Sequence, residues 1–187
     1  ICPAKSIPVD VAALIFTSGT TGFPKGVTMT HQSMVFARDS ILEYLRLGPE
    51  HKIINVLPLA FDYGLYQLLM AAALGATLVL ERSFTYPGAV FARMLKEKVT
   101  VFPGVPTIYS TLLSMHKTSL LSFPSVTRVT NTAAALPPDY IGSLREIFPN
   151  ALIFAMYGLT ECKRVSYLEP ELIDKKRGSV GKAIPGT

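Results

Sequence analysis

The chain has 187 residues, of which 49% are hydrophobic, 17% are charged and 10% are aromatic. This composition is typical of a folded protein with a sizeable core and argues against intrinsic disorder. The net charge of +5 comes from lysines and arginines that are scattered along the chain. This pattern indicates a solvated surface and predicts no nucleic-acid partner.

The apolar and cysteine patterns bear on membrane insertion, disulfide formation and the expected cellular compartment. Residues 65–80 form the longest apolar stretch, but polar residues and Gly75 interrupt it, so we expect no membrane span. Cys2 and Cys162 are far apart and form no CxxC pair, which predicts neither a disulfide nor a metal site. This cysteine usage fits a reducing compartment, and we expect a cytoplasmic protein.

Short aliphatic runs alternate with longer helical patterns, and proline or glycine stands at most of the joints. The expected strands are 12–17, 52–57, 76–80, 100–102, 127–130 and 152–156. The expected helices are one from an N-cap at Thr30 toward Leu47, then 64–74 ended by Gly75, 88–98, 106–115 and 138–148,. This alternation favours an α/β fold, a mostly parallel sheet with helices on both faces, whose loops at the carboxyl ends of the strands bind ligands.

Residues 17–27 read TSGTTGFPKGV and lie between the strand expected at 12–17 and the helix expected after Thr30. Small residues let backbone N–H groups approach phosphate oxygens, and Lys25 adds a positive charge. Four hydroxyl groups can also donate to phosphate, those of Thr17, Ser18, Thr20 and Thr21. The run is not a Walker A loop, because Gly26 rather than serine or threonine follows the lysine. On composition alone, a surface turn explains it equally well.

A second polar run, MYGLTE at 156–161, follows the last expected strand. Tyr157 can stack on a purine, and Gly158 permits a tight turn. Thr160 can donate to a phosphate, and Glu161 can bind Mg2+. A plain turn is the competing interpretation of so short a run.

These two runs, in this order, resemble the signature loops of the adenylate-forming superfamily, which contains acyl-CoA synthetases, peptide-synthetase adenylation domains and luciferase. The resemblance implies that the first loop binds the β- and γ-phosphates of ATP through Thr17, Ser18, Gly19, Thr20, Thr21, Gly22 and Lys25. It also implies that Tyr157 and Gly158 contact adenine, Thr160 the α-phosphate and Glu161 the Mg2+ ion. Lys25, Thr160 and Glu161 would then be the catalytic residues.

Two further segments take roles from the same resemblance. Ala134 and Ala135 occupy the place where relatives line the adenine, although Thr132 and Ala133 replace the usual glycines. Phe61 and Asp62 stand where amino-acid-activating members carry a Phe-Asp pair that binds the substrate ammonium group. A buried carboxylate would discriminate an amino acid from a plain fatty acid. An ordinary helix cap is the alternative for Asp62.

The residues that follow the second motif have plainer expectations. Lys163 and Arg164 are expected to be exposed to solvent, and contact with a phosphate is the alternative. Cys162 is expected to be a packing neighbour rather than a nucleophile, because no paired histidine is visible.

The activity implied by the resemblance begins with attack of a carboxylate on the α-phosphorus of ATP, giving an acyl-adenylate and pyrophosphate. The acyl group then passes to the thiol of coenzyme A or of a phosphopantetheine on a carrier protein. The first hypothesis is therefore an AMP-forming acid-thiol ligase of the acyl-CoA synthetase type. An amino-acid adenylation unit that loads an acyl-carrier protein is the second, and a nucleotide-binding module without turnover is the third.

The resemblance extends over residues 17–186 and corresponds to the middle of the family's large N-terminal domain. The first methionine is Met29, and the chain ends within a glycine- and proline-rich phrase. We therefore expect residues 1–187 to be a partial N-terminal domain without the C-terminal domain. Such a piece is not expected to complete adenylation by itself.

Overall fold

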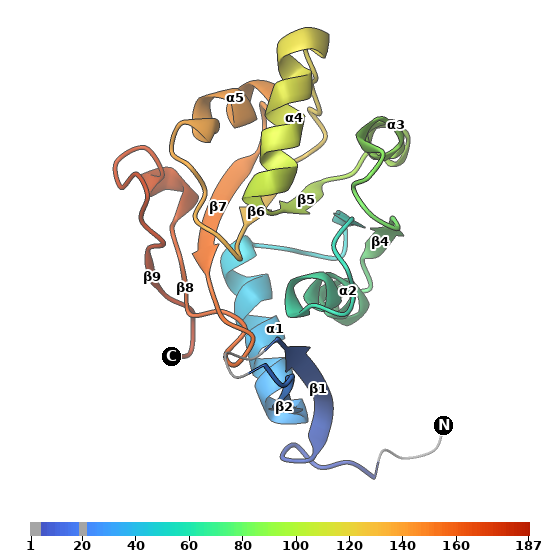
Figure 1. Ribbon diagram of the computed structural model, residues 1–187, viewed down its shortest axis with the longest axis vertical. Helices are drawn as coiled ribbons and strands as arrows, with labels where there is room; N and C mark the ends of the chain where they lie inside the picture. The colour runs from blue at the N-terminus through green and yellow to red at the C-terminus, as the bar shows by residue number, and fades with distance from the viewer. Residues whose placement is uncertain (1–4, 19–21) are drawn as a thin grey trace.

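The computed structural model describes residues 5–18 and 22–187 and has an α/β architecture (Figure 1). Its elements begin with β1 (Val11–Thr17), β2 (Lys25–Thr30), α1 (His31–Leu45), β3 (Lys52–Asn55), α2 (Asp62–Leu74), β4 (Thr77–Leu80) and α3 (Pro87–Glu97). They continue with β5 (Val101–Gly104), α4 (Pro106–Ser119), β6 (Arg128–Asn131), α5 (Tyr140–Ile147), β7 (Leu152–Tyr157), β8 (Ser166–Tyr167), the 3-10 helix η1 (Pro170–Leu172) and β9 (Lys182–Ala183).

The main sheet has seven strands in the order β4-β3-β5-β6-β7-β8-β9. The first five are parallel, and β8 and β9 join them antiparallel. From β3 the chain passes through α2 to β4 at the edge of the sheet, and it then moves the opposite way, through α3, α4 and α5, to β5, β6 and β7. Because crossovers between parallel strands are right-handed, α2 covers one face of the sheet and α3, α4 and α5 cover the other. Helix α1 contacts α2, and α4 contacts α5. The predicted fold class is therefore confirmed.

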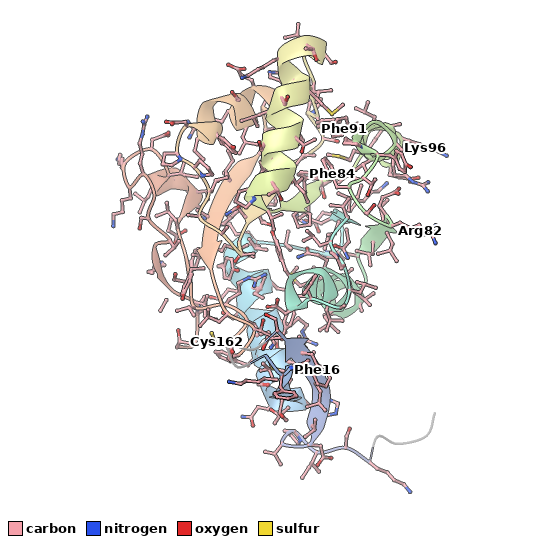
Figure 2. The ribbon with its side chains drawn as sticks, in the orientation of Figure 1. Phe16, Arg82, Phe84, Phe91, Lys96 and Cys162 are labelled. Atoms are coloured by element: carbon pink, nitrogen blue, oxygen red, sulfur yellow. The ribbon has the colours of Figure 1, made fainter. Side chains whose placement is uncertain are left out.

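The core lies between the sheet and these helices. Ile53, Ile54, Phe102 and Val129 on the central strands are fully buried, as expected for a sheet that is covered on both faces. Phe84 and Phe91, labelled in Figure 2, pack against each other with ring centroids 5.9 Å apart. This spacing is favourable for edge-to-face aromatic contact. Aromatic packing thus fills the space between α3 and the sheet.

The first strand does not belong to the main sheet. β1 and β2 form a separate antiparallel pair in which Thr17 is opposite Lys25, and the pair lies against α1 at the lower end of the molecule in Figure 1. The predicted strand before the phosphate loop and the predicted helix after Thr30 are both present, but the intervening strand β2 was not predicted. Strand β2 begins with a lysine and a glycine, which have low strand propensity, and continues with Val27 and Thr28, which favour a strand,.

Local signals fixed most helix ends correctly. Thr30 caps α1, where its Oγ1 accepts a hydrogen bond from the Ser33 backbone N–H at 3.1 Å. Gly75 ends α2 with a φ of 65°, a left-handed conformation that favours glycine. Helix α5 begins two residues later than the expected Pro138, because the preceding residues form a turn in which the Tyr140 N–H bonds the Pro137 carbonyl. No helix within 5–18 and 22–187 is long and apolar enough to cross a membrane.

The crossover from β3 to α2 is held tightly. The Asn55 side chain donates to the Gly64 carbonyl oxygen at 3.2 Å and accepts from the Leu57 N–H at 3.1 Å. A Cβ atom on Gly64 would overlap with the carbonyl oxygen of Pro58. These contacts place Asp62, the first residue of α2, at the carboxyl edge of the sheet.

We predict that Gly64→Ala lowers the free energy of unfolding by about 1–3 kcal/mol, because the added methyl group meets backbone that cannot move away. Gly88→Ala on α3 is the matched control, since a Cβ at Gly88 meets nothing within 4 Å. That control should change stability by no more than about 1 kcal/mol, in the stabilising direction. Denaturant unfolding measures both, and equal stabilities of the two variants would contradict the prediction.

Candidate active site

A cleft of about 300 Å³ opens at the carboxyl edge of the main sheet. The start of α2 and the loops after β6 and β7 meet there. Its lining consists of Asp62, Tyr63, Thr132, Ala133, Gly158, Leu159, Thr160, Glu161 and Arg164. The expectation that ligand-binding residues gather at the carboxyl ends of parallel strands therefore agrees with the geometry.

Tyr63 forms a rigid wall of the cleft. Its hydroxyl donates to the Thr130 carbonyl oxygen at 2.8 Å, and the Tyr109 hydroxyl donates to the same oxygen at 2.7 Å. Burial disfavours the phenolate and raises the pKa of Tyr63 to about 12,. The ring is therefore neutral and fixed in position over the physiological pH range.

Arg164 lies against this ring, with its guanidinium carbon 4.9 Å from the ring centroid. Its Nη1 donates to the Lys163 carbonyl oxygen at 2.7 Å and lies 3.8 Å from the Asp62 Oδ2. Its Nε is buried and has no hydrogen-bond partner in the described structure. The side chains of Arg164 and Asp62 are 4% and 18% exposed, so the prediction that Arg164 faces solvent is wrong.

The Asp62–Arg164 pair is too long for a direct hydrogen bond. Each group therefore keeps hydrogen-bonding capacity for a third partner in the cleft. A buried N–H group without a partner costs about 1–3 kcal/mol, a cost that the fold carries at the Arg164 Nε. The pair presents one negative and one positive group to the same space.

The loop after β7 brings Thr160 and Glu161 into the cleft. Backbone hydrogen bonds close this loop, in which the N–H groups of Cys162 and Lys163 both donate to the Leu159 carbonyl oxygen. A Cβ on Gly158 would overlap with the Lys163 carbonyl oxygen, so this position requires glycine. The turn itself comprises residues 160–162, and Gly158 lets the chain at Lys163 approach closely.

Glu161 is exposed at the cleft. Magnesium in nucleotide sites is held by one or two carboxylates together with phosphate oxygens, and this single accessible carboxylate fits such a role. Within 5–18 and 22–187, no group of three or more histidine, cysteine or acidic side chains could hold a metal by itself.

Lys163 is also buried, with 3% of its surface exposed, so its predicted exposure is wrong. Its Nζ donates to the Thr160 carbonyl oxygen at 2.5 Å and contacts the Met29 Sδ at 2.6 Å. Burial is the main cause that lowers the pKa of Lys163. Cys162, in contrast, is exposed and is labelled in the lower part of Figure 2. It is therefore not the packing neighbour that was expected.

A sequence model of the AMP-binding enzyme family matches residues 3–187. This chain belongs to that family. It is 31% identical over 186 residues to 4-coumarate--CoA ligase 3 of Oryza sativa subsp. japonica, an alignment that covers 95% of this chain and 33% of the ligase.

Solved structures of similar proteins have the same fold. The crystal structure of VinN superposes with a TM-score of 0.88 at 37% identity, over 99% of this chain and 46% of VinN. The structure of O-succinylbenzoate coenzyme A synthetase (MenE) from Bacillus subtilis with ATP and a magnesium ion gives a TM-score of 0.85 at 29% identity, over 96% of this chain and 37% of that enzyme. The chain thus spans between a third and a half of these relatives. The predicted membership of the adenylate-forming enzymes is confirmed.

The sequence-predicted site residues fall into four groups in space. Asp62, Gly158, Thr160 and Glu161 line the cleft together. Phe61 and Tyr157 are exposed beside it and are not part of its lining. Ala135 lines a second, smaller cavity instead, and Ala134 is exposed, with its carbonyl oxygen accepting a hydrogen bond from Asn131.

The described phosphate-loop residues lie on the β1–β2 hairpin rather than in the lining of the cleft. Thr17 and Lys25 end and begin the two strands, and Ser18 and Gly22 are exposed between them. Gly22 has a φ of 85°, which favours glycine,. Gly19, Thr20 and Thr21 lie outside the described residues. The hairpin reaches the cleft loop through the contact of Lys163 with Met29.

Sequence reasoning missed Tyr63, Thr132, Ala133 and Arg164 as parts of the cleft. One signal was present, because the glycines that Thr132 and Ala133 replace mark a special backbone conformation. Ala133 indeed has a φ of 71°, a left-handed conformation that a non-glycine residue adopts at a cost. Nothing in the sequence pattern distinguished the burial of Arg164.

We predict that the free energy of unfolding depends on pH in a way that reports the raised pKa of Tyr63. The folded-state pKa of about 12 lies above the reference value of 10.0, so the stability contributed by this tyrosine is complete below pH 10 and is lost as the pH rises toward 12. Between these pH values, the free energy of unfolding should fall more in the parent than in Tyr63→Phe, by up to about 3 kcal/mol.

The matched control is Tyr86→Phe, because Tyr86 is exposed. Its stability should follow that of the parent across the same pH range. Denaturant unfolding at a series of pH values measures all three proteins. Parallel curves for the parent and Tyr63→Phe would contradict a buried, neutral Tyr63.

Proposed function

We propose that this chain is part of the N-terminal domain of an AMP-forming ligase that activates a small amino acid with ATP. The observation that carries the proposal is the pair of Asp62 and Arg164 at the cleft, beside the Thr160–Glu161 loop. Family membership supports the ATP-dependent activation of a carboxylate, and the charged pair supports the class of acid.

Asp62 and Arg164 would recognise opposite charges on one substrate. The Asp62 carboxylate would accept hydrogen bonds from an ammonium group, and the Arg164 guanidinium would donate to a second carboxylate or another oxygen. VinN, whose fold this chain shares, has been solved with L-aspartate and with 3-methylaspartate. Both ligands carry an ammonium group and a second carboxylate, which supports a substrate of this kind.

The nucleotide would lie between the hairpin and the β7 loop. Lys25 and the hydroxyl groups of Thr17, Ser18, Thr20 and Thr21 would neutralise the charge on the departing pyrophosphate. Gly19 and Gly22 would let backbone N–H groups approach, and Thr160 would donate to the α-phosphate. Tyr157, Gly158, Ala134 and Ala135 would surround the adenine. The MenE complex with ATP and magnesium supports this use of the fold.

Glu161 would hold a magnesium ion on the phosphates. When bound, this ion offsets the negative charge of the phosphates and keeps them in place for the attack. The protein residues then have two tasks, which are to orient the substrate carboxylate through Asp62 and Arg164 and to keep donors aimed at the phosphates. Both tasks depend on groups that are already positioned in the fold.

The second step would pass the acyl group to the thiol of coenzyme A or of a carrier-protein phosphopantetheine. The likeness to a 4-coumarate--CoA ligase supports coenzyme A, whereas an amino-acid substrate favours an acyl-carrier protein. We also propose that a C-terminal domain outside these residues completes the catalytic site, since the chain spans less than half of VinN. A cytoplasmic location accords with the separated cysteines.

We predict that the full-length protein catalyses pyrophosphate exchange with aspartate-like amino acids and that Asp62→Ala lowers kcat/KM for them about 100-fold, because the substrate ammonium loses its buried partner. Asp39→Ala is the matched control, since Asp39 is an exposed residue of α1. That control should retain the activity of the parent. Pyrophosphate exchange across amino, aryl and fatty acids measures the profile.

The alternatives give different profiles. Exchange that depends on aryl or fatty acids and does not change in Asp62→Ala would contradict the amino-acid proposal and support an acyl-CoA synthetase for uncharged acids. Binding of MgATP without exchange for any acid would support a nucleotide-binding module without turnover.

We predict that Glu161→Ala raises the magnesium concentration needed for half-maximal exchange roughly tenfold or more, because a metal ligand is lost. Glu146→Ala removes an exposed glutamate of α5 and serves as the control. Titration of Mg2+ at a fixed ATP concentration measures the shift. The same magnesium dependence in the parent and Glu161→Ala would show that this carboxylate does not hold the ion.

A further inference from the structure

The side chain of Lys163 joins two parts of the chain that are far apart in sequence. Its Nζ donates to the Thr160 carbonyl oxygen and also contacts the Sδ of Met29, which is buried on β2. A lysine is almost never buried without a partner, and these two groups are the contacts of its Nζ in the described structure. One buried ammonium group therefore spans the hairpin and the β7 loop.

Several contacts hold the backbone of Lys163 in one conformation. Lys163 has a φ of 62°, a left-handed conformation that costs energy for a residue with a Cβ atom. Its N–H donates to the Leu159 carbonyl oxygen at 2.7 Å, and its own carbonyl oxygen accepts from Arg164 at 2.7 Å. Gly158 leaves just enough space for that carbonyl group. Gly158, Leu159 and Arg164 thus hold Lys163 in an unfavourable conformation.

The two parts that Lys163 joins carry the two halves of the proposed nucleotide site. Met29 is four residues beyond Lys25 on β2, and Thr160 and Glu161 lie in the cleft. The hairpin is a two-stranded sheet with exposed residues such as Leu14 and Phe16, so few core contacts fix its position. Figure 2 shows Phe16 on this hairpin, away from the main sheet.

We propose that Lys163 is a positioning residue that sets the phosphate-loop hairpin relative to the Thr160–Glu161 loop. The proposal rests on the function proposed above, in that both loops are taken to bind MgATP. Lys163 does not itself touch the nucleotide in this scheme. It holds the Thr160 carbonyl group on one side and Met29 on the other, so its removal should affect MgATP more than the acid substrate.

The principal test is Lys163→Met in the full-length protein, a change that keeps an unbranched apolar side chain and removes the donor. We expect the KM for MgATP in pyrophosphate exchange to rise about tenfold, while the KM for the acid changes less than about twofold. Lys96→Met on α3 is the matched control, because Lys96 is exposed and projects away from the body of the molecule (Figure 2). A general loss of kcat with both KM values unchanged would overturn the proposal.

Amide hydrogen exchange provides a readout that does not need turnover. In Lys163→Met, residues 25–30 and 158–163 should exchange faster by about tenfold, whereas β5 and β6 should not change. Unchanged exchange in the hairpin would overturn the proposal even if activity fell. If the parent shows no acid-dependent pyrophosphate exchange, the proposed function fails, and hydrogen exchange still decides whether Lys163 positions the hairpin.

A second variant covers the case in which Lys163→Met does not fold. Met29→Leu keeps the volume of the side chain and removes the sulfur atom, so the Lys163 contact with Thr160 stays intact. We expect a two- to threefold rise in the KM for MgATP, on the order of the smallest couplings measured between packed residues, and faster exchange in β2 alone. Parent-like values for both measurements in Met29→Leu would show that the contact between Lys163 and Met29 positions nothing.

Discussion

The parallel pairing of β5, β6 and β7 determines where every loop of the cleft begins. Gly104 lies opposite Asn131, and Asn131 lies opposite Ala155, so these strands end at nearly the same level. Backbone hydrogen bonds and the close packing of side chains on both faces of the sheet fix this register,. Because the strands end at one level, the loops that follow β6 and β7 meet at the same edge of the sheet and form the cleft there.

The cleft is built from charged groups that the fold removes from water. The Arg164 Nη1 lies 3.8 Å from the Asp62 Oδ2, a distance that leaves both groups open to a ligand. Buried charges add little stability compared with apolar residues of the same size. Their retention at the cleft is therefore more easily explained by binding than by folding. Lys163 is a further buried basic side chain, and its contacts with Thr160 and Met29 join the cleft loop to the hairpin.

Local rules predicted the elements whose signals are contained within a few residues. The Thr30 cap, the Gly75 turn and the glycine at 158 depend on neighbouring atoms alone, and the structure has each of them. Strand β2 was missed, although Val27, Thr28 and Thr30 favour a strand, because residues 17–27 were interpreted as one phosphate loop,. The burial of Lys163 was missed because it depends on Met29, which is distant in sequence.

The sequence by itself determined the family, the alternation of strands and helices, and the presence of Asp62, Thr160 and Glu161 beside strand ends. These conclusions depend on residue types at fixed short spacings, which the chain carries without folding. Only the tertiary structure decided that Tyr63 and Arg164 line the same cleft as Asp62, and that the phosphate loop belongs to a separate hairpin. The physical reason is that burial and strand pairing are properties of contacts between distant segments.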